Sequence, residues 1–104
     1  MSASSLNEEK MRKDAEWMRQ PADDRILEVL CEEGNMTPRA VSRDGEVSRA
    51  DVSRDYAGSR LRVLRKYGLV RRLDRGLYQI TNRGVRYLDE ELDAATLEPA
   101  DESN

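Results

Sequence analysis

Apolar residues recur with helical spacing in the stretch that follows Pro21. One face of it has the i, i+1, i+4, i+5 spacing of a helix that packs on a core, and this face carries Ile26, Leu27, Leu30 and Cys31. Asp23 or Asp24 is a suitable N-cap, and Gly34 ends the pattern. The pattern predicts a helix between these limits, with Cys31 as a small core residue.

A short second helix is predicted to begin at Thr37. Threonine is a good N-cap, and Pro38 suits the first helical position because its missing N–H would have no partner there. The pattern ends near Gly45.

Residues 46–52 allow two interpretations. Ser48 and Asp51 could form a capping box that opens a long helix, or the stretch is a connector and the helix begins at Ser53. We favour the connector, because Gly58 would otherwise lie inside a helix of about 20 residues, where glycine is unfavourable. The apolar face of the helix from Ser53 to Gly68 consists of Ala57, Leu61 and Leu64.

Two short β-prone runs, 69–73 and 77–81, flank the tripeptide Asp74-Arg75-Gly76. Runs joined by three residues with glycine last predict a hairpin whose Gly76 takes the left-handed conformation. Thr81 or Asn82 then caps a final helix, whose apolar positions are Val85, Leu88 and Leu92. Residues 94–104 are acidic and contain Pro99, so we expect a disordered tail.

Residues 6–19 form a mostly polar stretch with helical spacing. Its apolar side chains are Leu6, Met11, Ala15, Trp17 and Met18. So sparse a stripe cannot sustain a helix alone, so it must pack on the domain's core or on a second copy of the chain. A ligand pocket is the less favoured alternative.

The predicted order is helix, helix, helix, hairpin, helix. This is the topology of a winged helix-turn-helix: mainly α with a small β-hairpin, and here with extra N- and C-terminal helices. We predict a helical extension over residues 1–20 that is a candidate dimer contact, a winged helix domain over 21–93, and the tail over 94–104.

Charge is segregated along the chain, although its net value is only −3. Residues 37–86 hold thirteen basic and five acidic side chains, a net charge of +8, whereas the segments before and after carry −4 and −7. A basic middle between acidic ends is the pattern of a nucleic-acid-binding surface on an acidic protein. The third helix is the one that a winged helix-turn-helix places in the major groove of double-stranded DNA, while the hairpin lies along the backbone or minor groove.

The composition also indicates an environment. The chain has three lysines against fifteen arginines and abundant carboxylates, which is typical of proteins from a salt-filled cytoplasm, and we favour this over an ordinary acidic protein rich in arginine. No apolar run is long enough to span a membrane, and the N-terminal residues lack a signal-peptide pattern. We therefore expect a halophilic, cytoplasmic protein.

Catalytic chemistry is not expected. The chain has no histidine and one cysteine, which removes His-based catalysis, zinc fingers and disulfide frameworks together. Its carboxylate pairs, such as Asp23-Asp24 and Glu90-Glu91, are adjacent in sequence and point in different directions from a helix. They indicate caps and solvated surface rather than a catalytic pair, and we expect neither an enzyme nor a cofactor or metal.

Several segments carry a resemblance to a known family: 23–28, 36–38, 64–70 and 73–81, followed by Gly84 and Tyr87-Leu88. They resemble the small winged-helix regulators of haloarchaea, which are similar to the phage phi-H repressor and more loosely to MarR-type regulators. The resemblance covers roughly residues 17–93. It implies an archaeal regulator that binds specific DNA sequences as a homodimer.

The candidate DNA-binding residues fall into three groups. On the third helix they are Ser53, Arg54, Asp55, Gly58, Ser59 and Arg62. At the start of the second helix, where free N–H groups favour a phosphate, they are Thr37 and Arg39. On the hairpin they are Arg71, Arg72, Arg75 and Gly76.

Each group has a simpler alternative. The arginines of the third helix could form ion pairs with Asp51 and Asp55 on a solvated face, and Gly58 could serve close packing inside the protein instead of close approach to DNA.

The candidate dimer contacts are Leu6, Met11, Trp17, Met18, Leu88 and Leu92. The alternative function is a winged helix that binds another protein or RNA. A small-molecule effector, if one exists, would fit between the terminal helices.

Overall fold

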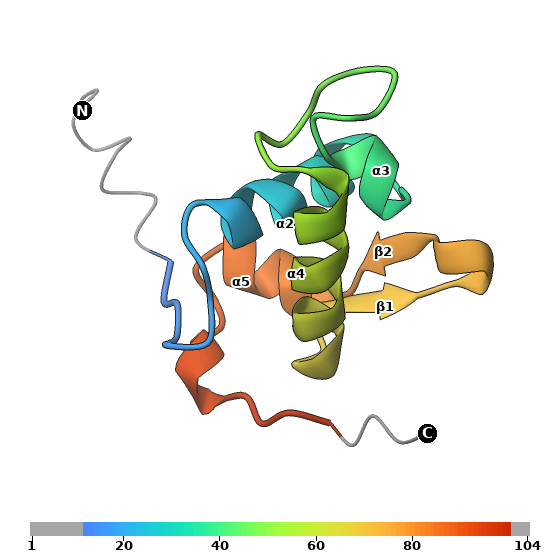
Figure 1. The fold of residues 1–104 in the computed structure, drawn as a ribbon. Coiled ribbons are helices and arrows are strands. Elements are labelled where there is room, and N and C mark those ends of the chain that lie inside the picture. The colour runs from blue at the N-terminus through green and yellow to red at the C-terminus, as the bar shows by residue number, and fades with distance from the viewer. Residues whose placement is uncertain (1–11, 101–104) are drawn as a thin grey trace.

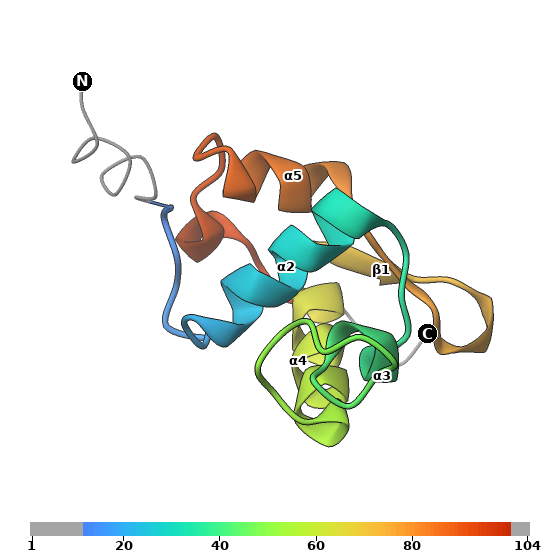
Figure 2. The same cartoon turned by 90° about the horizontal axis from the view of Figure 1, so that it is seen from above.

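The computed structural model describes residues 12–100, and of Arg75 only the backbone. The elements in chain order are α2 (Ala22–Glu33), α3 (Pro38–Val41), α4 (Arg54–Lys66), β1 (Val70–Arg72), the 3₁₀ turn η1 (Asp74–Gly76), β2 (Tyr78–Ile80), α5 (Asn82–Leu88) and the 3₁₀ turn η2 (Ala94–Thr96). Helix α2 lies between α4 and α5, and the hairpin projects to one side (Figures 1 and 2). This arrangement is the predicted winged helix-turn-helix.

The core forms where α2 meets α4, α5 and the hairpin. Its fully buried side chains include Ile26, Leu27 and Val29 of α2, Leu61 and Leu64 of α4, and Tyr87 of α5. Apolar burial of this kind is the main stabilising contribution to a small domain.

Three helices begin where local capping chemistry predicts. The side chains of Thr37, Ser53 and Thr81 each accept a hydrogen bond from the backbone N–H three residues ahead. This satisfies one of the N–H groups that the first turn leaves without a partner. Of the two starts considered for the third helix, the one at Ser53 is confirmed.

The hairpin also agrees with the prediction. Val70 pairs with Ile80 and Arg72 with Tyr78 in antiparallel register, and Gly76 has a φ of 75°, the left-handed region that glycine tolerates. Tyr78 forms a second bridge to Met36, with both backbone hydrogen bonds made. The sheet is thereby tied to the segment between α2 and α3.

The first helix differs from the prediction at its start. Helix α2 begins at Ala22 after Pro21, and neither Asp23 nor Asp24 is an N-cap. Asp23 is completely buried, so the view of the Asp23-Asp24 pair as caps and solvated surface is wrong for this residue. Its buried environment follows from a basic partner on α4, described below.

The prediction for Cys31 is wrong, because this residue is exposed. The buried residues of α2 are Asp23, Ile26, Leu27, Val29 and Leu30, so the buried face extends to Val29 on one side and ends before Cys31 on the other. Since each helical step turns about 100°, Cys31 is rotated out of the core.

The described part of the N-terminal extension is not helical. Residues 12–20 form an irregular segment, in which Lys13 bridges Asp93 and the Ala94 N–H donates to the Lys13 carbonyl. Met18 is buried in the chain's own core and Trp17 packs against it. Tertiary contacts of this kind replace the helix that the sparse apolar spacing suggested.

The C-terminal region is more ordered than predicted. Helix α5 ends at Leu88, so Leu92 lies beyond it, and the chain continues into η2 with Ala94 fully buried. The Ala100 N–H then donates to the Lys66 carbonyl at the end of α4. Residues 94–100 are therefore part of the domain rather than of a disordered tail, and residues 101–104 lie outside the described part.

Candidate DNA-binding surface

Helix α4 has a buried and an exposed face. Ala57, Leu61 and Leu64 face the core, as the apolar spacing predicts. Asp55, Ser59 and Arg62 are exposed, and at about 100° per residue they lie along one line of the opposite face. Lys66, half-buried, continues this line by one turn and was not among the predicted residues.

The two predicted DNA-binding arginines of α4 differ in their partners. Arg54 forms an ion pair with Asp55 at 3.3 Å, and both side chains are largely exposed, so the pair contributes little to stability. Arg62 is exposed and has no ion pair within the described residues. Asp51, the other acid considered as a local partner, pairs with Arg43 at 3.5 Å. Arg62 is thus available to an external ligand, and so is the exposed Arg65 about one turn further along α4, which also has no ion pair within the described residues.

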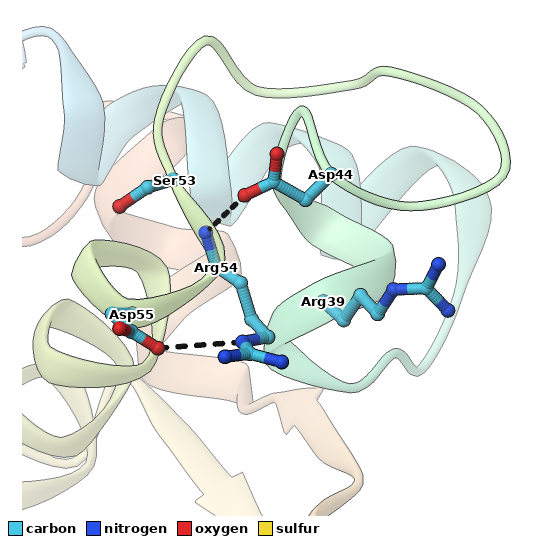
Figure 3. A pocket seen from close by; sticks show the side chains of 5 residues that line it. All are labelled: Arg39, Asp44, Ser53, Arg54 and Asp55. Atoms are coloured by element: carbon cyan, nitrogen blue, oxygen red, sulfur yellow. Dashed lines mark hydrogen bonds and ion pairs between the residues drawn. The ribbon is translucent and has the colours of Figure 1, made fainter.

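A polar pocket of about 300 Å³ lies where α3, the loop that connects α3 to α4 and the first turn of α4 meet. Figure 3 shows the five residues that line it. The Asp44 side chain accepts a hydrogen bond of 2.9 Å from the Arg54 N–H, so it caps α4 in addition to Ser53. The Arg39 side chain extends away from Arg54 (Figure 3). Arg39 is exposed and leaves its guanidinium available.

The start of α3 offers less to a phosphate than the sequence suggested. The helix has four residues, Pro38 lacks an N–H, and the Ala40 N–H is taken by the Thr37 hydroxyl at 3.2 Å. A helix of four residues with one of its first donors absent and another satisfied has little positive potential at its N-terminus. The Arg39 side chain, rather than the backbone, is the cationic group here.

The loop between α3 and α4 is fixed to the domain. Ala50 is fully buried, and backbone hydrogen bonds join Ala50 to Val41 and Arg43 to Val52. The loop therefore holds Ser53, and with it the start of α4, at a defined place despite its length.

Gly58 packs inside the protein rather than at the exposed face. It is buried, and a Cβ built there would lie 3.7 Å from Pro38 Cβ and 3.7 Å from Arg62 Nη1, ordinary van der Waals distances. Because a Cβ would fit there, packing between α3 and α4 does not by itself require a glycine, and the role of Gly58 stays a prediction.

Gly58→Ala is expected to stabilise the protein by about 0.5–1 kcal/mol, because alanine fits the space and lowers the entropic cost of the helix. Urea unfolding measures the change. DNA binding should be retained, and a variant that is more stable but binds DNA more weakly would show that this position must approach the DNA closely.

The hairpin presents arginines at its surface. Arg71 and Arg72 are exposed, and Arg71 Nε donates to Gln79 Oε1 on the paired strand at 2.7 Å. Arg75 lies in η1 at the tip, before Gly76. The hairpin projects beyond α4 on the side where α3 lies (Figures 1 and 2), so α3, α4 and the hairpin border one side of the molecule.

The sequence pattern did not distinguish a second kind of arginine on α4. Arg60 is buried and points inward, where Nε and Nη2 donate to the two carboxylate oxygens of Asp23, each at 2.8 Å. The hydrogen bonds that Arg60 donates to Asp23 raise the pKa of its guanidinium, although burial opposes this. An inward arginine opposite an aspartate 37 positions earlier has no local signal in the sequence.

The candidate dimer contacts are only partly placed by this structure. Leu6 and Met11 lie outside the described residues, Leu88 and Leu92 are half-buried against the core, and Trp17 stacks on Tyr67 of its own chain with ring centroids 3.8 Å apart. Met18 is buried, so packing within the chain accounts for it.

Comparison with known proteins identifies the family. A family model of winged helix-turn-helix phage repressors matches residues 11–100. The chain belongs to this phage repressor family. The crystal structure of the PhiH1 repressor-like protein from Haloarcula marismortui is similar, with 36% sequence identity and a TM-score of 0.74, over 86% of this chain and 97% of that one. No curated protein matches the chain.

Membership in the phage repressor family supports a DNA-binding regulator as the broad class, and this class is not enzymatic. The predicted resemblance to haloarchaeal phage repressor-like proteins is confirmed. The halophilic composition agrees with the source of the Haloarcula protein. None of the described helices is long and apolar enough to cross a membrane.

Proposed function

We propose that the protein is a transcriptional repressor that binds specific sequences of double-stranded DNA as a homodimer. The observation that carries this proposal is the exposed line of Asp55, Ser59 and Arg62 on α4. In a winged helix-turn-helix, this helix enters the major groove, where each base pair presents a distinct pattern of donors and acceptors.

Arg62 is the residue proposed to read a base. An unpaired guanidinium can donate two hydrogen bonds to O6 and N7 of guanine, and such a contact discriminates between bases by about 1–3 kcal/mol. Ser59 can bond to several bases, and Asp55 can accept from cytosine N4. Arg54 uses only its Nε–H in the exposed pair with Asp55, so its terminal N–H groups can still contribute to DNA binding.

The remaining cations are proposed to contact the DNA backbone. Arg39 on α3 and Arg71, Arg72 and Arg75 on the hairpin flank α4. In a salt-filled cytoplasm the Debye length falls to about 3 Å at 1 M salt. Long-range attraction is then weak, so direct hydrogen bonds must supply most of the binding.

A homodimer would place two α4 helices in successive major grooves. Dimers of this class read two half-sites about one helical turn apart. We assign the dimer contact to the region of Trp17, Leu88 and Leu92, together with Leu6 and Met11. Repression would follow from occupation of a promoter, as expected for a member of the phage repressor family.

The proposal is tested by selecting binding sites from random duplex DNA at moderate and at molar potassium chloride. Enrichment of an inverted repeat that survives molar salt is the expected result. No enrichment at either salt with folded protein would contradict it, and would favour a winged helix that binds another protein or RNA.

Arg75→Ala is expected to weaken binding to all duplexes equally and to lower the salt dependence of log K by about one phosphate contact, a slope change of about 0.9. Titration of selected and random duplexes over a range of salt measures both effects. A change in sequence preference instead would place the hairpin tip against the bases.

A further inference from the structure

The centre of the recognition helix is joined to the N-terminal region by a buried ion pair. Arg60 lies one turn before Leu64, on the inner side of α4, and its side chain is 10% exposed while that of Asp23 is fully buried. The guanidinium meets the carboxylate with two parallel hydrogen bonds of 2.8 Å. This bidentate geometry fixes the orientation of the guanidinium relative to the carboxylate as well as the distance between them.

Further hydrogen bonds hold both partners in place. Nη2 of Arg60 also donates to the Trp17 carbonyl at 2.9 Å. The Asp23 carboxylate also accepts from the Arg19 N–H at 3.0 Å. The pair therefore ties three segments at one point: the stretch 17–19, the first turn of α2 and the middle of α4.

A buried ion pair of this kind contributes little net stability to a protein. Removing two charges from water costs so much that a buried ion pair can often be replaced by apolar side chains without loss. Its distinct property is direction, since apolar contacts such as those of Leu61 and Leu64 are non-directional and tolerate a small rotation of the helix. The two hydrogen bonds from Arg60 to Asp23 do not tolerate such a rotation.

A small rotation of α4 would matter at its outer face. With side chains, a helix has a radius of about 5–6 Å, so a rotation of about 20° moves a surface group by about 2 Å. Hydrogen bonds between N–H and oxygen require heavy-atom distances of about 2.7–3.2 Å. A displacement of this size is therefore enough to take Arg62 or Ser59 out of reach of a base edge.

We propose that the Asp23–Arg60 pair sets the rotation of α4 and thereby determines sequence specificity without touching DNA. Arg60 is a positioning residue in this proposal, and its basic charge is not part of the DNA contact. The inference rests on the proposed function, since it assigns a role within specific DNA binding.

The test compares binding to a selected duplex with binding to random duplex. The main variant is Asp23→Asn/Arg60→Met, which removes both charges together and leaves an acceptor for the Arg19 N–H. Its fold is checked first by circular dichroism and urea unfolding. We expect the ratio of the two affinities to fall by roughly tenfold, about the value of one base contact, with affinity for random DNA nearly unchanged.

A second variant covers loss of folding in the first. Arg60→Lys keeps the charge but loses the bidentate geometry. It should also lower the ratio of the affinity for the selected duplex to that for random duplex. The matched control is Arg12→Met, which removes an arginine paired with Asp24 and Glu28 and 12% exposed, away from α4. This control should lose stability but keep the ratio.

The outcomes separate the inference from the proposed function. A folded double variant, or a folded Arg60→Lys variant, whose ratio equals that of the wild type would overturn the positioning role. An equal fall in the ratio for Arg12→Met would reduce the effect to general destabilisation and would also overturn it. If the wild type itself prefers no duplex, the proposed function fails instead.

Discussion

Asp23→Ala is expected to destabilise the protein by about 3–5 kcal/mol, which is a large part of the total stability of a domain of this size. The substitution leaves the Arg60 guanidinium buried without its counter-charge, and it removes the acceptor for the Arg19 N–H. The cost of a buried unpaired charge, rather than the loss of an attraction, is the main reason for the size of the effect.

Urea unfolding measures this loss, with Asp55→Ala as the matched control. Asp55 also pairs with an arginine, but its side chain is 88% exposed, so its removal should change stability by less than about 0.5 kcal/mol. A loss below about 1 kcal/mol for Asp23→Ala would mean that the Arg60 guanidinium reaches water when its partner is gone. The ion pair would then not be a rigid link between α2 and α4.

Arg62→Ala is expected to abolish much of the sequence preference while leaving stability unchanged. The side chain is exposed and has no ion pair within the described residues, so its removal leaves no buried group unsatisfied. The loss of one bidentate contact to guanine costs about 1–3 kcal/mol of binding free energy, roughly a factor of 5–150 in affinity for the selected duplex. Binding to random DNA should weaken far less, since only one cation is lost.

Arg86→Ala on α5 is the matched control for charge, because it removes an exposed arginine from another helix. Fluorescence titration of selected and random duplexes with both variants measures the difference. Equal behaviour of Arg62→Ala and wild type on both duplexes would rule out this face of α4 as the reading surface. It would then assign the binding of bases to another part of the molecule.

The sequence predicted those parts of the fold that depend on neighbours in the chain. Thr37, Ser53 and Thr81 cap helices through bonds to an N–H three residues ahead. Gly76 turns the hairpin because only its own backbone has to adopt a positive φ. Such signals are complete within a few residues, so the order of elements and the winged helix topology could be derived before any tertiary contact was known.

The exposed face of α4 was predicted for a similar reason. The spacing of Ala57, Leu61 and Leu64 defines the buried side, and Asp55, Ser59 and Arg62 then fall opposite to it. Whether these side chains contact DNA remains a prediction. The structure adds that Arg62 is unpaired within the described residues, whereas Arg54 is held by Asp55.

Only the tertiary structure decided where the remaining polar and small residues lie. Cys31 satisfied the apolar spacing but is exposed, because the neighbouring elements cover α2 on the side of Val29 instead. Residues 94–100 looked like an acidic tail but are ordered by contacts with Lys13 and Lys66, which are remote in sequence. The composition of residues 94–100 does not indicate these contacts.

The buried ion pair shows the physical reason most clearly. Arg60 and Arg62 are two residues apart on the same helix, and either could have been assigned to the DNA. Arg60 faces inward because Asp23 meets it there from α2, and a buried charge is tolerated only with such a partner. A chain determines its local turns and caps alone, but the environment of a charge depends on what the fold brings next to it.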